Sequence, residues 1–167
     1  MKEEQEKTKS KKKQSLKIPP RNPKNILSDE NLKFFYEEIL LFVESDIKGY
    51  GSFNDLKKLI NGNEQIKKFQ FQYKYYKKYL DKPVINVFYF DACGKKEKSK
   101  NNSIINNWFK HLRNAFAHNY ITIDEESGCY TLKDFNNENK KQTLLAIIDN
   151  IDDFKCLVKT AKSLSYK

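Results

Sequence analysis

Apolar residues recur at the spacing of an α-helix along three stretches between residues 28 and 80. Ser28 can cap the first helix, because two acidic residues follow it at the positive end of the helix dipole. Gly49 and Gly51 are expected to end this helix. Two further helices are predicted at residues 52–62 and 63–80. The apolar positions expected on the buried face of the first helix are Leu32, Phe35, Ile39, Phe42 and Val43.

The apolar run at residues 84–90 is rich in β-type residues but too short for its period to separate strand from helix. A strand or an extended segment is expected there. Residues 94–102 predict a polar loop, after which Ser103 opens a strongly patterned helix. The buried stripe of that helix is predicted to contain Ile105, Trp108, Leu112 and Phe116.

After this helix the pattern changes to that of strands. Residues 120–124 and 129–133 are β-type runs around a Glu/Ser/Gly turn, which predicts a hairpin. A third strand is predicted at residues 142–147, and an amphipathic helix closes the chain. The whole pattern predicts a mainly α fold, a bundle of about four to five helices with a small β hairpin or meander inserted before the last helix.

The positive charge is unevenly distributed along the chain. The net charge is +10, from 32 basic and 22 acidic residues. Residues 1–24 contain eight Lys, one Arg and three Glu, which leaves a net charge of +4 for the rest. We expect residues 1–25 to form a flexible basic tail and residues 26–167 to form a single domain. The tail could bind a polyanion or could be a solvated lead-in.

Composition argues against several classes of protein. No run of eighteen apolar residues and no apolar leader segment is present, so neither a membrane span nor a secretory signal is expected. Cys93, Cys129 and Cys156 stand far apart without CxxC spacing, which favours thiols in a reducing compartment, and we expect a cytoplasmic protein. No His/Cys/carboxylate cluster has the spacing of metal ligands, so neither a metal nor a cofactor is expected.

The chemistry of the chain concentrates in the helix that begins at Ser103. His111, Asn114 and His118 fall on nearly one line of that helix, with Arg113 beside them, about 140° around the axis from His118. Of the 32 basic residues, 30 are Lys and only two are Arg. A chain that uses Lys almost everywhere favours a geometric role for Arg113, such as forked recognition of phosphate or carboxylate oxygens.

The segment LRNAFAHNY (112–120) resembles the signature of the HEPN superfamily, an arginine usually followed by asparagine, with a histidine four to six positions beyond. The resemblance extends from about Ile104 to the end of the chain. It implies metal-independent RNA cleavage, in which Arg113 would stabilise charge on the phosphoryl oxygens and His118 would transfer protons. Asn114 would orient the imidazole or contact the phosphate.

A dimer is also expected. His111 and His118 are separated by about 10 Å along the helix, so both cannot easily reach one phosphate. Two copies of His118 across a two-fold axis could do so, and HEPN proteins pair in this way. We therefore expect an RNA substrate and a homodimer with a composite active site, with His111, Asn119 and Tyr120 as lower-ranked contacts in the cleft.

Alternatives remain open at several positions. Tyr120 completes an Arg-x4-His-x-Tyr pattern that resembles HEPN toxins modified by a nucleotidyltransferase antitoxin, but it could simply begin a strand. His118 could be a favourable partner of the helix dipole, Arg113 a structural ion-pair residue and His111 a wall of the cleft. The leading hypothesis is a toxin or abortive-infection ribonuclease, with an antitoxin or other regulatory protein as a candidate partner. The alternatives are an inactive HEPN module that binds RNA, nucleotide or a protein, and an ordinary helical interaction domain.

Overall fold

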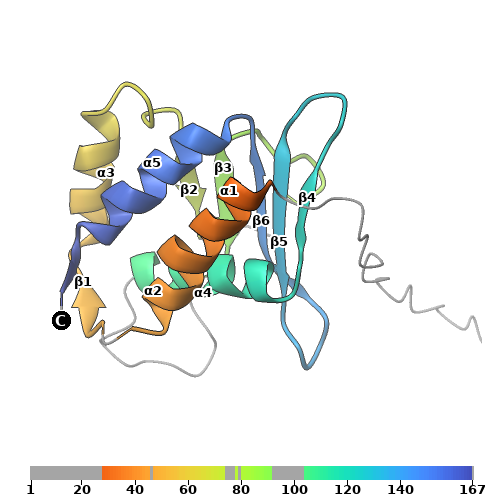
Figure 1. Ribbon diagram of the computed structural model, residues 1–167, viewed down its shortest axis with the longest axis horizontal. Helices are drawn as coiled ribbons and strands as arrows, with labels where there is room; N and C mark the ends of the chain where they lie inside the picture. The colour runs from red at the N-terminus through yellow and green to blue at the C-terminus, as the bar shows by residue number, and fades with distance from the viewer. Residues whose placement is uncertain (1–27, 46, 74–77, 79, 92–103, 167) are drawn as a thin grey trace, which may run out of the picture.

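The computed structural model describes residues 28–45, 47–73, 78, 80–91 and 104–166 of the chain. These residues form an α/β fold, in which helices cover one face of a five-stranded mixed sheet and a separate two-stranded sheet lies beside them (Figure 1). The prediction of a mainly α bundle with an inserted hairpin is therefore wrong. The predicted β elements are parts of a larger sheet that also recruits segments from the first half of the chain.

The five-stranded sheet has the order β2 (Gln70–Gln72), β3 (Val87–Phe90), β6 (Gln142–Ile148), β5 (Tyr130–Phe135), β4 (Ile121–Ile123). β2 and β3 are parallel, and the other neighbours are antiparallel. The predicted hairpin is confirmed as β4 and β5, and the predicted third strand is confirmed as β6. β6 occupies the centre of the sheet, because β3 pairs with its free side.

The helix predicted at residues 63–80 is wrong over its described part, where turns lead into β2. Ile66, Phe69 and Tyr73 have a helix-like spacing, but Phe69, Phe71 and Tyr73 also alternate as in a strand. The rings of Phe71 and Trp108 lie 5.2 Å apart, edge to face. Packing of these aromatic rings on the sheet therefore favours the strand over the helix in this segment. Residues 74–77 and 79 lie outside the described part of the chain.

The run at residues 84–90 is confirmed as containing a strand, β3. All four of its residues are buried, and Phe88 pairs with Ala146 of the central strand β6. A strand covered on both faces needs no alternation of apolar and polar residues, which explains its continuous apolar sequence.

One long helix crosses the front of the molecule in Figure 1, through α1 (Asp29–Phe34), the π-helical segment η1 (Phe35–Leu40) and α2 (Leu41–Val43). The predicted cap is confirmed, since the Ser28 hydroxyl accepts a hydrogen bond from the Asn31 amide at 3.4 Å. The helix ends at Val43, before the two glycines. Leu32 is 44% exposed, so the prediction that it faces the core is wrong.

The remaining helices and the small sheet complete the domain. α3 (Phe53–Asn61) begins at its Ser52 cap, and α5 (Ile151–Lys162) begins at its Asn150 cap. β1 (Gly49–Tyr50) and β7 (Ser165–Tyr166) then pair antiparallel, which ties the end of the chain to the segment after the first helix. A side chain at Gly49 would meet the outer end of the Tyr166 ring, and this exposed ring would have to move to make room for it.

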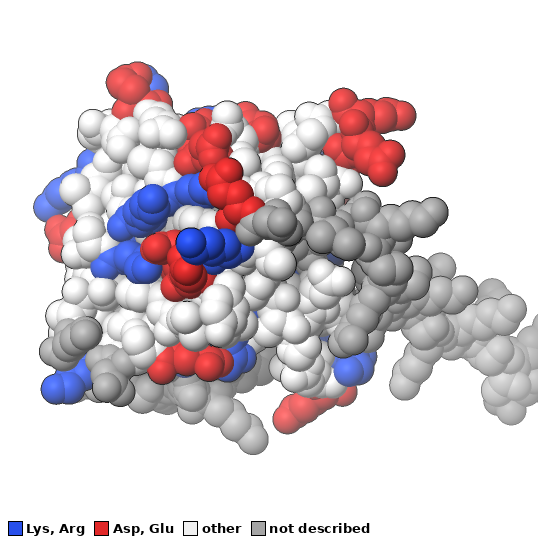
Figure 2. Space-filling model, viewed as in Figure 1, with Lys and Arg blue, Asp and Glu red and all other residues white. Residues whose placement is uncertain are grey.

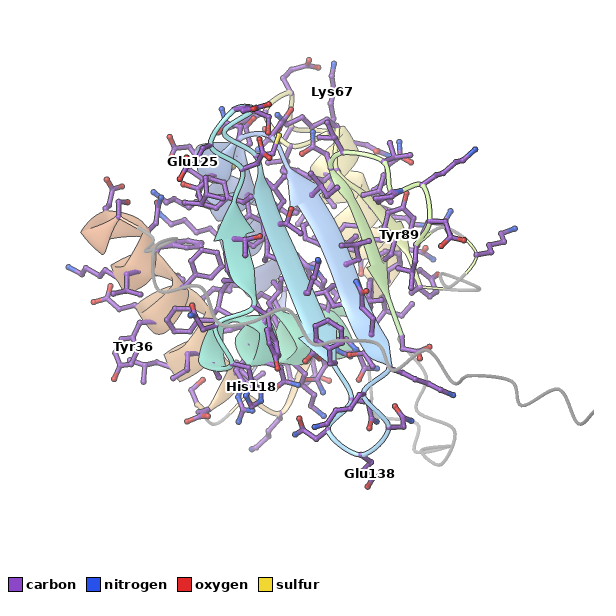
Figure 3. The ribbon with its side chains drawn as sticks, turned by 90° about the vertical axis from the view of Figure 1, so that its right-hand side faces the viewer. Tyr36, Lys67, Tyr89, His118, Glu125 and Glu138 are labelled. Atoms are coloured by element: carbon purple, nitrogen blue, oxygen red, sulfur yellow. The ribbon has the colours of Figure 1, made fainter. Side chains whose placement is uncertain are left out.

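The helix α4 (Ile104–Ala117) lies between the first helix and the sheet and positions the candidate site. Its predicted buried stripe is confirmed for Ile105, Trp108 and Leu112, whereas Phe116 is half-buried and stacks on Phe35 at 5.7 Å. Residues of α4 also contact β5 directly. Figure 3 looks onto the opposite face of the sheet, away from these helices.

Surface charge on the helical side alternates in sign. Lys155 pairs with Glu30, and Lys162 pairs with Glu38, so basic and acidic side chains lie next to each other over α5 and the first helix (Figure 2). The predicted basic tail at residues 1–25, the predicted loop at 94–102 and Cys93 lie outside the described residues. Within the described ranges, no helix is both long and apolar enough to cross a membrane.

Candidate active site at the end of helix α4

The end of α4 is fixed by a Schellman cap. Asn119 has a φ of 54°, in the left-handed region that asparagine tolerates better than most residues. Its amide donates to the Phe116 carbonyl at 3.0 Å, and the Tyr120 amide donates to the Ala115 carbonyl at 2.8 Å. This cap places His118 directly after Ala117, the last residue of α4, and the chain then turns into β4. The exposed Asn119 thus has a defined backbone role at the site.

Arg113 extends from α4 towards the end of the first helix. Its Nη1 donates to Asn114 Oδ1 at 3.0 Å, and its Nη2 donates to Glu44 Oε1 at 3.0 Å. The Arg113 side chain is 37% exposed, while its Nε atom is buried and has no hydrogen-bond partner among the described residues. The guanidinium is therefore held at two points, and part of it still faces solvent.

Asn114 connects Arg113 to a buried acid on the sheet. Its Nδ2 donates to Asp134 Oδ2 at 3.3 Å, while its Oδ1 accepts from Arg113. Asp134 belongs to β5 and is only 2% exposed. The half-buried Asn114 is thus fixed from both ends of its amide group.

His111 lies one turn earlier on α4 and contacts the same carboxylate. Its Nδ1 lies 2.7 Å from Asp134 Oδ2, and its Nε2 lies 3.0 Å from the backbone oxygen of Asp91. The side chain is 16% exposed. Both ring nitrogens of His111 therefore have partners within the chain.

His118 has a different environment. Its half-buried ring lies 5.9 Å from the Tyr120 ring, and the Tyr120 ring lies 5.1 Å from Phe135. Neither ring nitrogen of His118 is hydrogen-bonded to any described residue. Figure 3 places His118 at the lower edge of the molecule, where α4 gives way to the sheet.

The six residues singled out from the sequence fall into two groups around the end of α4. Arg113, Asn114 and His111 are linked through Asp134, while His118, Asn119 and Tyr120 form the turn into β4. No hydrogen bond or ring contact joins the Arg113 and His118 side chains within the described structure. To contact both residues, a substrate group would have to lie between the Arg113 side chain and the His118 side chain.

Sequence reasoning missed two acidic residues of the site. Asp134 shares the inward-facing side of β5 with Leu132, two residues earlier, so a carboxylate at a core-facing strand position was the available signal. The sequence interpretation ended the strand at Lys133 and left Asp134 out. Glu44 comes from the other end of the domain in sequence, and no local pattern relates it to Arg113.

The described residues contain no group of three or more His, Cys, Asp or Glu side chains that could hold a metal ion. Cys129 and Cys156 are free thiols, each partly buried. The chemistry available at the end of α4 is therefore that of a guanidinium, an amide and an imidazole. These groups can bind phosphate oxygens and can transfer protons.

Comparison with known proteins gives one match. Residues 9–166 match the family HEPN pEK499 p136. No curated protein and no solved structure matches the chain. Because the match spans nearly the whole sequence, including α4 and the turn that follows it, the chain belongs to the HEPN pEK499 p136 family, and the HEPN resemblance of its Arg113–His118 segment is confirmed at the level of the family.

Proposed function

We propose that this protein is a metal-independent endoribonuclease of HEPN type. The observation that carries the proposal is the contrast within one short segment of α4, where Arg113 and Asn114 are hydrogen-bonded to each other and the His118 imidazole is left unbonded by the described residues. Family membership supports an RNase-type or nucleotide-binding module. Of these two functions, the guanidinium, amide and imidazole groups of Arg113, Asn114 and His118 favour RNA cleavage at a phosphate.

The proposed reaction is a transesterification. The RNA 2′-oxygen forms a bond to the neighbouring phosphorus as an imidazole removes its proton, and the bond from phosphorus to the 5′-oxygen breaks. An imidazolium gives a proton to that leaving oxygen, which yields a 2′,3′-cyclic phosphate and a free 5′-hydroxyl. Arg113 stabilises the additional negative charge on the phosphoryl oxygens. Each proton transfer contributes about 10²–10⁴-fold to the rate.

The proposed enzyme is a homodimer, because this reaction uses a proton acceptor and a proton donor and each chain supplies one unbonded His118. An apolar hollow of about 390 Å³ supports the pairing. It is lined by Leu32, Lys33, Tyr36 and Phe116, the last only two residues before His118. Leu32 and Tyr36 are 44% and 50% exposed, which is unusual for large apolar side chains on one helix face. A second copy covering this surface would lie beside the end of α4, which His118 follows directly.

Dimer formation can be tested by sedimentation. We expect the parent protein to sediment as a dimer, and Leu32→Asp with Tyr36→Asp to sediment as a folded monomer with little cleavage activity. Leu59→Asp is a matched control, since Leu59 is similarly exposed at 41% on α3. A parent protein that stays monomeric at high concentration would contradict the composite site.

We further propose that the nuclease acts as a toxin or antiphage effector that cleaves RNA in the cell and is restrained by an antitoxin or another regulatory protein. Tyr120 is the proposed position for a silencing modification, because its ring contacts His118 at 5.9 Å. A bulky group there would obstruct the imidazole. Expression of the parent should arrest growth, whereas expression of His118→Ala should not.

A second candidate function is a catalytically inactive HEPN module that binds RNA, nucleotide or a protein partner. The ion pair between Arg113 and Glu44 favours it, because the guanidinium is already occupied by a carboxylate. A ligand with a stronger negative charge could displace Glu44 without any reaction. Binding of RNA without cleavage would support this function.

The deciding experiment is RNA cleavage in excess EDTA by the parent, His118→Ala and Arg113→Ala. We expect cleavage by the parent, cyclic phosphate ends and no cleavage by either variant. Lys110→Ala is the control, because Lys110 is an exposed cation on the same helix. Chelator-sensitive cleavage, or full activity of His118→Ala, would contradict the proposed mechanism.

A further inference from the structure

We propose that Asp134 is the positioning residue of the candidate site. It fixes the Asn114 amide and, through that amide, the Arg113 guanidinium. His111 is the half-buried partner that holds the Asp134 carboxyl group in place. The consequence for catalysis rests on the proposed ribonuclease function, whereas the consequence for side-chain geometry can be measured without it.

The Asp134 carboxyl group accepts hydrogen bonds on both oxygens. Oδ1 accepts from the Phe135 amide at 2.8 Å. Oδ2 has His111 Nδ1 at 2.7 Å, Thr143 Oγ1 at 3.0 Å and Asn114 Nδ2 at 3.3 Å. Such a group, nearly fully buried and contacted from α4, β5 and β6, has very little freedom to move.

A β-bulge contributes one of these contacts. The register of β5 and β6 shifts between Asp134, which pairs with Leu144, and Phe135, which pairs with Gln142. Thr143 is therefore the extra residue on β6, and its hydroxyl turns to the Asp134 carboxylate. Bulges commonly redirect side chains beside functional sites in this way.

The chemistry of its two neighbours fixes the orientation of Asn114. A guanidinium can only donate hydrogen bonds, so the Asn114 atom facing Arg113 must be oxygen. An ionised carboxylate can only accept, so the Asn114 atom facing Asp134 must be nitrogen. Loss of the negative acceptor at position 134 would remove the reason for this orientation, and the Arg113 contact would become variable.

His111 is committed to the network at both ring nitrogens. A backbone carbonyl can only accept, so Nε2 carries a hydrogen that points at Asp91. Nδ1 therefore shares a proton with the Asp134 carboxyl group. His111 has no free lone pair with which to remove a proton from a substrate, so its role is to hold Asp134.

The first test compares Asp134→Asn with the parent. An asparagine at position 134 has the same shape, but its amide nitrogen meets a donor in either orientation, the Asn114 amide nitrogen in one and the Phe135 amide in the other. We expect the side-chain ¹⁵N resonances of Asn114 and Arg113 to shift and broaden. We also expect kcat for RNA cleavage to fall about 10–100-fold with little change in KM, as for loss of supporting hydrogen bonds at other sites.

Thr143→Val is the matched control, because it removes another donor to the same Asp134 oxygen but leaves Asn114 in place. We expect its Asn114 and Arg113 resonances to shift less than those of Asp134→Asn, and its kcat to fall less, because the Asn114 contact to the carboxylate remains. If the network were merely structural, kcat would follow thermal stability in both variants. Equal kcat values for Asp134→Asn and Thr143→Val at temperatures where both are folded would overturn the proposal.

A pair of isosteric variants at His111 keeps the proposal testable if Asp134→Asn does not fold. The nitrogen of His111→Asn replaces Nδ1 and retains the donor to Asp134, whereas the nitrogen of His111→Gln replaces Nε2 and loses it. We expect His111→Asn to keep most of the activity and the parent-like Asn114 resonance, and His111→Gln to lose both. Equal and complete loss of activity, with parent-like Asn114 and Arg113 resonances in both, would identify His111 as a catalytic base instead.

The two readouts separate failure of this proposal from failure of the proposed function. If the parent does not cleave RNA but the Asn114 and Arg113 resonances change in Asp134→Asn, the ribonuclease proposal fails and the positioning role stands. If those resonances do not change in Asp134→Asn or His111→Gln, the positioning role is overturned whatever the parent does to RNA.

Discussion

The two halves of the candidate site differ in how firmly the chain holds them. Arg113 and Asn114 belong to a continuous set of hydrogen bonds that runs from the Asp91 backbone through His111 and Asp134 to Glu44. His118, only one helical turn from Asn114, has a ring contact with Tyr120 and no hydrogen bond to a described side chain.

This difference indicates that the single chain fixes its candidate phosphate-binding groups in advance. Its candidate proton-transfer group has no hydrogen-bond partner among the described residues. A phosphate-binding group benefits from being fixed in advance, because no reorganisation is then needed when charge develops. A proton-transfer group must exchange its proton with the substrate, so an unbonded imidazole is the suitable state for it. We infer that RNA and a second copy of the chain supply the missing partners of His118.

The largest effect is expected at the loosely held half. His118→Ala should lower the rate of RNA cleavage by about 10²–10⁴-fold, because it removes the proton-transfer group. It should change the free energy of unfolding by no more than about 0.5 kcal/mol, since it breaks no hydrogen bond to the described residues. Cleavage assays and urea denaturation measure the two quantities. A His118→Ala variant that is strongly destabilised but still cleaves RNA would contradict this prediction.

The tightly held half should show the opposite behaviour in stability. Asp134→Ala leaves the donors of His111, Asn114 and Thr143 without their acceptor in a buried site, and we expect the free energy of unfolding to fall by about 3–5 kcal/mol. Urea denaturation of Asp134→Ala beside His118→Ala gives the contrast. Similar stabilities of the two variants would show that the hydrogen-bond network is not rigid.

Arg113→Lys tests whether the geometry of the guanidinium matters beyond its charge. A lysine cannot donate in a fork to Asn114 and Glu44 together, so we expect the cleavage rate to fall by about 100-fold. The measurement is single-turnover cleavage, with Arg113→Ala for comparison. Parent-like activity of Arg113→Lys would mean that a point charge is sufficient.

The smallest effect is expected at Glu44, for which we propose competition with phosphate for Arg113. The Glu44 side chain is 52% exposed, so its ion pair contributes only about 0.2–1 kcal/mol. Glu44→Gln should therefore tighten RNA binding by about 1.5–5-fold, as measured by fluorescence anisotropy. Glu37→Gln, an exposed acid on the same helix, is the control. Weaker RNA binding by Glu44→Gln would mean that Glu44 positions Arg113 instead of competing for it.

The same contrast explains what the sequence could predict about the site. Arg113, Asn114 and His118 lie on or directly after one helix, so their spacing in the sequence was sufficient to group them as one candidate site. Asp134 and Glu44 reach Arg113 and Asn114 only through the packing of β5 and the first helix on α4. Long-range contacts of this kind leave no local period in the sequence.

The fold was predictable where one period dominated. The Trp108 helix, the β4–β5 hairpin and the helix α5 all follow clear patterns. Phe69, Phe71 and Tyr73 satisfied two periods at once, and only their contacts with rings on β3 and α4 decide for a strand. β6 is central because β3 pairs with its free side, and β2 then extends the sheet beyond β3. No local pattern relates these two strands to the hairpin, which is why the class of the fold was wrong.

Attack by the RNA 2′-hydroxyl is tested most directly by a cleavage assay in excess EDTA. The substrate is an RNA whose cleavage position has been mapped and whose ribose at that position is then replaced by 2′-deoxyribose. We expect the parent to cut the all-ribose strand to a 2′,3′-cyclic phosphate and to leave the substituted strand intact at that position. Cleavage of the substituted strand at the same rate would contradict attack by the 2′-hydroxyl and with it the proposed roles of Arg113, Asn114 and His118.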